Sequence, residues 1–253
     1  MTFKQSTSPE VIGICTSQSL RRFDLQLLRS LSRQYEIAQW EYCQNPDEAI
    51  DLDIAIATLH EYLQTCKGSV HLVGHGIAGL VGWLYAKKYP EQVRSLTLLS
   101  VGVNLATSWH SHYYEQRQLM GCSRETMLMR TAFYLFGYRD QAMLSWLANL
   151  LKQDLDNSFV PHSLYAPIYI APTPIAVPML VCGALDDYVI GGENAYQKWR
   201  LYLKDRDRLW LSDQGKHFFH YSQWQTVSNQ IRSFWNSLAL NQAVSIKQQI
   251  EFR

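Results

Sequence analysis

An aspartate and a histidine in the last third of the chain have the types and spacing needed for acid–base chemistry. Asp186 follows the apolar run 178–182, and His217 follows the apolar run 208–211. If Asp186 accepts a hydrogen bond from one ring nitrogen of His217, the other nitrogen becomes a general base. A pair of this kind activates the serine of a nucleophilic triad.

The position where such a nucleophile is expected holds a glycine. The apolar run 70–73 leads into G-H-G-I-A-G at residues 74–79, and an apolar helix is expected over 80–89. A strand, a sharp turn and a helix in this order lift the central side chain of the turn above a sheet. Gly76 takes that central place and has no side chain. Glycine also avoids the roughly 1–2 kcal/mol that left-handed backbone angles cost other residues.

Three segments together resemble the α/β-hydrolase superfamily. Residues 74–79 are similar to its G-H-S-x-G-G nucleophile elbow, with Gly76 in place of the serine and Ala78 in place of a glycine. Residues 183–189 (G-A-L-D-D-Y-V) resemble the family's G-x-x-D-x-x-V, which places the acid at Asp186. Residues 214–218 (Q-G-K-H-F) resemble the loop that carries the catalytic histidine, His217.

The resemblance implies a site without its nucleophile. Loss of the serine from such a triad costs roughly 10⁶-fold in kcat, so hydrolysis through an acyl-enzyme is excluded as this chain's task. The main-chain N–H of Ile77 is one expected oxyanion donor. The loop containing Ser17 stands where the family often has a His-Gly pair, so Ser17 is the second expected oxyanion or pocket residue.

The elements expected around these motifs alternate between strand and helix. Strands at 10–15, 35–40, 70–73, 93–101, 179–182 and 208–211 predict a mostly parallel sheet of about six strands with helices on both faces. The resemblance implies that this sheet is that of an α/β-hydrolase fold. The helix after the second strand is expected to begin at Pro46. A final helix is expected over 222–238. The tail 242–253 has a weak period of two, so a frayed end, an added strand or a docking segment are its alternatives.

One stretch breaks the alternation. Residues 102–177 read as consecutive helices at 104–119, 124–136 and 140–151, followed by a return punctuated by prolines. The resemblance implies a helical cap inserted into the core. We therefore expect a core of residues 1–101 and 178–253 with a cap or lid of residues 102–177.

Composition restricts the partners. The chain has 253 residues and a net charge of +1, so it offers no basic field for nucleic acid. It has no apolar run of membrane-spanning length and no apolar leader, and its five cysteines form no C-x-x-C pair, which favours a cytoplasmic protein with free thiols. We expect no cofactor. His75, His110 and His112 lack the spacing of a metal site, so no metal is expected either.

The function expected from these residues is that of a non-catalytic pseudoenzyme, which binds a small apolar ligand or a protein partner through its pocket. One alternative is a non-covalent enzyme, either a hydrolase or a cofactor-free enzyme that uses His217 with Asp186 as a general base. Another is an inactivated esterase or lipase-like hydrolase. Ligand identity and oligomeric state leave no signature in the sequence.

Overall fold

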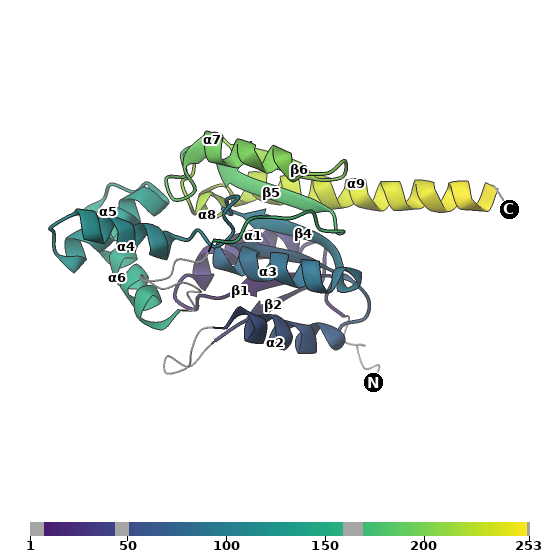
Figure 1. Cartoon of the computed structure of the whole chain (residues 1–253), viewed down its shortest axis with the longest axis horizontal. Helices are drawn as coiled ribbons and strands as arrows, with labels where there is room; N and C mark the ends of the chain where they lie inside the picture. Colours follow the sequence, from purple (N-terminus) through teal and green to yellow (C-terminus); the bar gives the residue numbers. More distant parts are fainter. Residues whose placement is uncertain (1–7, 44–50, 159–168, 252–253) are drawn as a thin grey trace.

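The computed structural model describes residues 8–43, 51–158 and 169–251, with side chains as far as residue 240. Its centre is a six-stranded parallel sheet in the order β2-β1-β3-β4-β5-β6 (Figure 1). The predicted α/β class, the parallel arrangement and the number of strands are confirmed. The strands are β1 (Val11–Cys15), β2 (Ile37–Glu41), β3 (Val70–His75), β4 (Val93–Leu99), β5 (Met179–Ala184) and β6 (Arg208–Ser212).

Helices cover both faces of the sheet, because alternate strand side chains point to opposite sides. On one face, Ile12, Leu72 and Leu96 share a core with α2 (Leu52–Gln64) and α3 (Ile77–Lys88). On the other face, residues such as Val73 and Leu180 pack against α1 (Leu25–Leu31) and α9 (Trp224–Glu251). Two short helices, α7 (Gly192–Gln197) and α8 (Phe219–Ser222), follow β5 and β6.

The helix after β2 begins later than the sequence suggested. Asp51 is its N-cap, with extended backbone, and its side chain accepts from the N–H of Asp53 at 2.8 Å. That bond satisfies a donor left free at the helix start. The expected start at Pro46 lies outside the described residues, but a helix running on from there is wrong because Asp51 is not helical.

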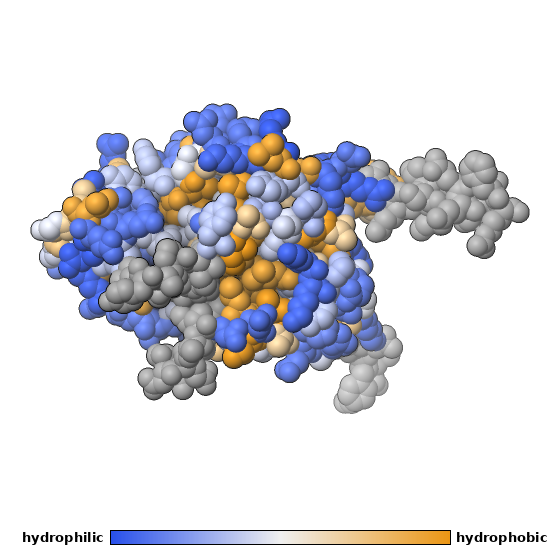
Figure 2. All heavy atoms as spheres, in the orientation of Figure 1, coloured by the Kyte–Doolittle hydropathy of each residue, from blue (hydrophilic) through white to orange (hydrophobic). Residues whose placement is uncertain are grey.

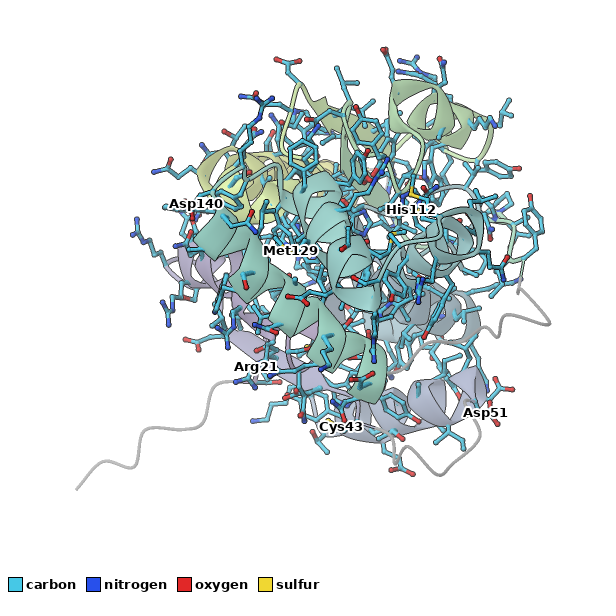
Figure 3. The ribbon with its side chains drawn as sticks, turned by 90° about the vertical axis from the view of Figure 1, so that its left-hand side faces the viewer. Arg21, Cys43, Asp51, His112, Met129 and Asp140 are labelled. Carbon is cyan, nitrogen blue, oxygen red and sulfur yellow. The ribbon has the colours of Figure 1, made fainter. Side chains whose placement is uncertain are left out.

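Three helices lie between β4 and β5, at one end of the sheet (Figure 1). They are α4 (Trp109–Leu119), α5 (Arg124–Phe136) and α6 (Gln141–Asn157), and we call this group the insertion. Each has a side-chain N-cap, from Ser108, Ser123 and Asp140 respectively. Figure 3 looks onto the insertion and shows Met129 among its helices and Arg21 at its edge.

Aromatic packing attaches α5 to the core. The Phe136 ring stacks on Phe218, with centroids 4.4 Å apart and planes at 10°, and contacts Phe23 at 4.7 Å. The Phe218 N–H also donates to the carbonyl of Leu135 at 3.2 Å. Aromatic pairs of this kind contribute about 0.5–1.5 kcal/mol beyond the area they bury. The insertion is therefore fixed to the loop that carries His217.

The last helix continues through the tail. Residues 242–251 extend α9, so the alternative in which this segment adds a strand is wrong (Figure 1). Within the described residues, no helix is both long and apolar enough to cross a membrane. Figure 2 shows hydrophobic atoms reaching the surface over α2 and α3, with hydrophilic atoms around them.

A buried histidine makes the stability of the core depend on pH. His71, on β3, is 4% exposed; its Nδ1 lies 2.7 Å from Ser95 Oγ, and its ring stacks on Trp235 at 4.5 Å. Burial first, and then the charge of Arg94, lowers the pKa of His71 from 6.5 to about 3. Below the unfolded pKa, the unfolded chain takes up a proton that the folded chain does not, so stability falls as pH falls.

Protonation of His71 in the unfolded chain should therefore lower the free energy of unfolding by about 2 kcal/mol as the pH falls from 6.5 to 5. Urea titrations across this range measure it in the wild type and in His71→Phe. Between these two pH values, the free energy of unfolding of the variant should fall by that amount less than that of the wild type. Parallel pH profiles for the two proteins would contradict the assignment.

Candidate functional site

The turn between β3 and α3 has backbone angles that favour glycine. Gly76 sits at φ 52° and ψ −121°, and its N–H donates to the carbonyl of Leu99 at 3.0 Å. A Cβ at Gly74 would lie 2.6 Å from the main chain of Ala78, and one at Gly79 would lie 2.7 Å from Val101. Close strand-to-helix packing thus requires glycine on both sides of the apex. At Gly76 itself, a Cβ would meet nothing within 4 Å.

This packing predicts a cost for a single methyl group. Gly74→Ala should destabilise the protein by about 1–3 kcal/mol, because the obstructing atoms belong to the backbone and cannot rotate away. The matched control is Gly121→Ala, where a Cβ meets nothing within 4 Å. Chemical denaturation measures both variants. Equal midpoints for the two would show that the turn relaxes without strain.

The carboxylate that faces His217 is Asp187. His217 Nδ1 lies 3.1 Å from Asp187 Oδ2 and 3.2 Å from Oδ1. Asp186, expected in this role, instead accepts from the N–H of Lys216 at 2.9 Å and pairs with its Nζ at 3.0 Å. The prediction of a His217–Asp186 pair is therefore wrong.

The difference between the two aspartates has a local cause. The side chain of Asp187 accepts from the N–H of Val189 at 3.0 Å, two residues on, which is an Asx turn. It also accepts from the N–H of Ile190 at 3.3 Å and from the Tyr196 hydroxyl at 2.9 Å. These bonds turn Asp187 inward. Both aspartates fit the G-x-x-D spacing to within one residue, so the spacing does not show which of them faces His217. The Asx turn from Asp187 to Val189 does.

Asp187 is a buried carboxylate whose charge is well supported. Burial by itself raises its pKa, but the charge and hydrogen bond of His217, the Tyr196 hydroxyl and the Ile190 N–H bring the pKa below its usual value. Burial, followed by the charge of Asp187, raises the pKa of Tyr196 well above its usual range, so Tyr196 stays a donor. The His217 ring is thus held in one orientation.

The main chain of His217 is held as well. Its carbonyl accepts from Ser100 Oγ at 2.6 Å and from His75 Nε2 at 3.0 Å. Burial, and then the charges of His220 and His217, lowers the pKa of His75 well below its usual value, which suits a neutral ring that donates from Nε2. Ser100 has a left-handed φ of 50°. Neither residue's role was predicted, since a serine after a strand carries no distinctive signal.

A pocket of about 550 Å³, partly open to solvent, lies over Gly76. This volume includes solvent at the open side of the pocket. Gly76, Ile77, Ser17 and His217 all line it, so the structure brings these expected site residues together and leaves Asp186 out. The other walls come from the loop after β1, from the turn and from the insertion: Ile14, Cys15, Thr16, Leu20, Arg21, Asp24, His75, Ala78, Ser108, Trp109, His110, Asp154, Ser158 and Phe218.

The structure places the two expected oxyanion residues, Ile77 and Ser17, differently. Ile77 is the first residue of α3, so its N–H has no partner within the helix. The Ser17 hydroxyl instead donates to Asp154 on α6 and accepts from the N–H of Leu20. The hydroxyl proton of Ser17 therefore does not point at an oxyanion; any contribution to an oxyanion hole would come from main-chain N–H groups.

His220, near the site, has a partner of its own: its Nε2 pairs with Asp24 at 2.9 Å. The five cysteines of the chain are free thiols. No group of three metal-ligating side chains occurs among residues 8–43, 51–158 and 169–240.

Several solved structures with similar folds are hydrolases by name. A carboxylesterase, CesB, from Bacillus subtilis superposes with a TM-score of 0.69, at 14% identity, over 91% of this chain and 85% of that one. A serine hydrolase from Cycloclasticus zankles gives 0.65, at 14% identity, over 92% and 91% of the two chains. A membrane phospholipase A gives 0.72 at 16% identity, over 93% and 81%. The fold is therefore the α/β-hydrolase fold.

Sequence comparison gives nearer relatives. No family model matches the chain. The uncharacterized protein sll0249 of Synechocystis sp. is 41% identical over 95% of this chain and 96% of its own length. The uncharacterized protein alr2406 of Nostoc sp. is 38% identical over 89% and 90%. At this identity and coverage, the chain belongs to the same protein family as sll0249 and alr2406.

Proposed function

We propose that this protein is a non-catalytic member of the α/β-hydrolase superfamily that binds a small ligand in the pocket over Gly76. The observation that carries the proposal is the turn between β3 and α3: its apex has elbow-like backbone angles, faces a pocket and carries no side chain. A pocket therefore remains over a turn that has no nucleophile.

Other nucleophiles near the pocket do not replace the serine. In the described part of the chain, the ring of His217 hydrogen-bonds only to Asp187, and no hydroxyl or thiol bonds to it. Cys15 lines the pocket, but burial, with the charge of Asp24, raises the pKa of its thiol to about 12. A protonated thiol is a poor nucleophile.

The insertion acts as the cap of this pocket. Trp109 and His110 on α4 and Asp154 on α6 supply part of its wall. Ligand selection would then depend on the insertion, as the division into a core and a cap of residues 102–177 implies.

A second candidate function is proton transfer by His217 and Asp187 without a covalent intermediate. The buried, multiply hydrogen-bonded Asp187 favours it, because an oriented histidine beside a pocket is a general base. A water or a substrate C–H at the place of the missing side chain would be its proton source. This alternative replaces the Asp186 of the sequence hypothesis with Asp187.

The test compares turnover with binding. We expect the wild type to hydrolyse p-nitrophenyl acetate and butyrate no faster than His217→Ala. We also expect ligand-observed NMR to show saturation transfer to small aromatic probes such as acetophenone, and p-nitrophenyl esters added in excess should compete with them. Turnover above the buffer rate that disappears in His217→Ala would reject a purely binding role and favour proton transfer.

A further inference from the structure

Arg21 marks the open side of the pocket, at the edge of the insertion (Figure 3). Its side chain is 48% exposed, and in the described part of the chain it is the only lysine or arginine that lines the pocket. We call Arg21 and the half-buried Ser17, Asp24 and Ser158 the mouth of the pocket. The deeper wall is buried and largely apolar, and includes Leu20, Ile77 and Phe218.

The guanidinium of Arg21 lies over the carboxyl edge of the sheet. Its Nη1 donates to Glu41 Oε2 at 3.1 Å, and Glu41 is the register partner of Cys15, a residue of the pocket wall. Burial and then the charge of Asp24 raise the pKa of the Cys15 thiol to about 12, and the charge of Arg21 opposes that rise. Because such an effect weakens with distance, the charged end of Arg21 lies beside the pocket wall.

Most of the hydrogen-bonding capacity of this guanidinium is open. A guanidinium carries five N–H groups in a planar fork. Within the described part of the chain, only the Nη1 of Arg21 has a hydrogen-bond partner, Glu41. A half-exposed ion pair of this kind contributes little, because water screens it. The side chain can therefore present free N–H groups to a ligand at the mouth.

The other polar side chains of the mouth already have partners. The Oδ1 of Asp154, on α6, accepts from three serine hydroxyls, those of Ser17, Ser158 and, at 2.9 Å, Ser19. Ser17 and Ser19 belong to the loop after β1, so this carboxylate ties the insertion to the core. Asp24 Oδ1 pairs with His220 Nε2 at 2.9 Å. Among the four residues of the mouth, the guanidinium is thus the side-chain donor that a ligand can reach.

We propose that the ligand of this pocket is an organic carboxylate with a short apolar body, whose head group binds the guanidinium of Arg21 at the mouth. This assignment rests on the proposed ligand-binding function. The planar fork of an arginine matches the two oxygens of a carboxylate. The apolar body packs inward, toward the bare turn at Gly76. Glu41 competes for the same guanidinium and Asp24 adds a second negative charge, so we expect affinities in the millimolar range.

The experiment uses the full chain and two probes of nearly the same shape. Phenylacetate carries a carboxylate, and phenylacetamide replaces one of its oxygens with an amino group and has no charge. We expect phenylacetate to bind about fivefold more tightly at low salt, because a half-exposed charge pair contributes no more than that. The difference should disappear in about 0.5 M sodium chloride, which screens the pair. NMR titrations measure both dissociation constants.

Three variants locate the charge effect. Arg21→Gln should bind both probes equally, because it removes the guanidinium and keeps a polar side chain. Glu41→Gln should tighten the binding of phenylacetate by about twofold and leave phenylacetamide unchanged, since it removes the competing carboxylate. The matched control is Arg22→Gln, which should keep the fivefold preference of the wild type. Arg22 is also exposed, but it lies over the Trp146 ring and does not line the pocket.

The outcomes separate this inference from the proposed function. Equal binding of the two probes to the wild type at low salt would overturn the role of Arg21 while leaving a ligand-binding pocket. A preference that survives in Arg21→Gln, or that Arg22→Gln loses to the same extent, would do the same, as would unchanged or weaker binding of phenylacetate to Glu41→Gln. Failure of both probes and of acetophenone to bind would reject both the inference and the ligand-binding function.

Discussion

Gly76→Ser is expected to create a residue that reacts with a fluorophosphonate and to raise ester hydrolysis by several orders of magnitude, up to the roughly 10⁶-fold that a triad serine contributes. The expectation rests on two observations: His217 is oriented by Asp187, and a Cβ at residue 76 meets no atom within 4 Å. Mass spectrometry of the labelled protein and the turnover of p-nitrophenyl butyrate measure the two effects.

The substitution should also destabilise the fold, since a serine at φ 52° occupies a sparsely populated backbone region that costs about 1–3 kcal/mol. Gly76→Ala is the matched control, because it introduces the same strain without a hydroxyl. Adding His217→Ala to Gly76→Ser should abolish labelling. An unlabelled Gly76→Ser protein that still folds would mean that the oxyanion donors, Ile77 and the loop around Ser17, no longer form a working site.

Asp187→Ala should lower the free energy of unfolding by about 3–5 kcal/mol, whereas Asp186→Ala should change it by less than about 1 kcal/mol. Asp187 is fully buried, and its loss leaves His217, the Tyr196 hydroxyl and two N–H groups without their acceptor. Asp186 is 30% exposed, and among the residues that the structure describes it pairs only with Lys216. Urea denaturation of the two adjacent variants is therefore an internally controlled measurement.

A third substitution, Asp187→Asn, should show how the contribution of this carboxylate depends on pH. The pKa of Asp187 is lower in the folded protein, so its stabilising effect is complete above the unfolded pKa of about 4 and is lost as pH falls through the folded value. The stability gap between the wild type and Asp187→Asn should consequently narrow below about pH 4. A gap that stays constant down to pH 2.5 would show that the carboxylate charge contributes nothing, and equal destabilisation by Asp186→Ala would restore the original assignment.

The sequence predicted the sheet well because each strand is a short apolar run between polar loops, and such runs depend on local pattern alone. It also predicted the positions of Gly76, Ile77 and His217 around one pocket, since the carboxyl ends of parallel strands lie at a common edge. The choice between Asp186 and Asp187 could not be made in the same way. It depends on which side chain turns inward, and Asp187 does so because it accepts from the N–H of Val189 and from the hydroxyl of Tyr196, nine residues away.

Other misses have equally physical causes. Acidic residues after Pro46 imitate a helix start, but the N-cap bond is made by Asp51. The tail has an ambiguous period, and its residues continue α9 because no glycine or proline interrupts that helix after Trp224. Asp154 looked like an ordinary helix residue, because two of its serine partners, Ser17 and Ser19, lie more than 130 positions earlier in the chain.

The attachment of α5 to the loop after β6 restricts how a molecule can enter the site. Phe136 lies flat on Phe218, the immediate neighbour of His217, and a main-chain bond joins Phe218 to Leu135. A hinged swing of the whole insertion would therefore drag the imidazole away from Asp187. A ligand can enter without that disruption if the pocket opens at the other junction, where serine hydroxyls, and not stacked rings, join the insertion to the core.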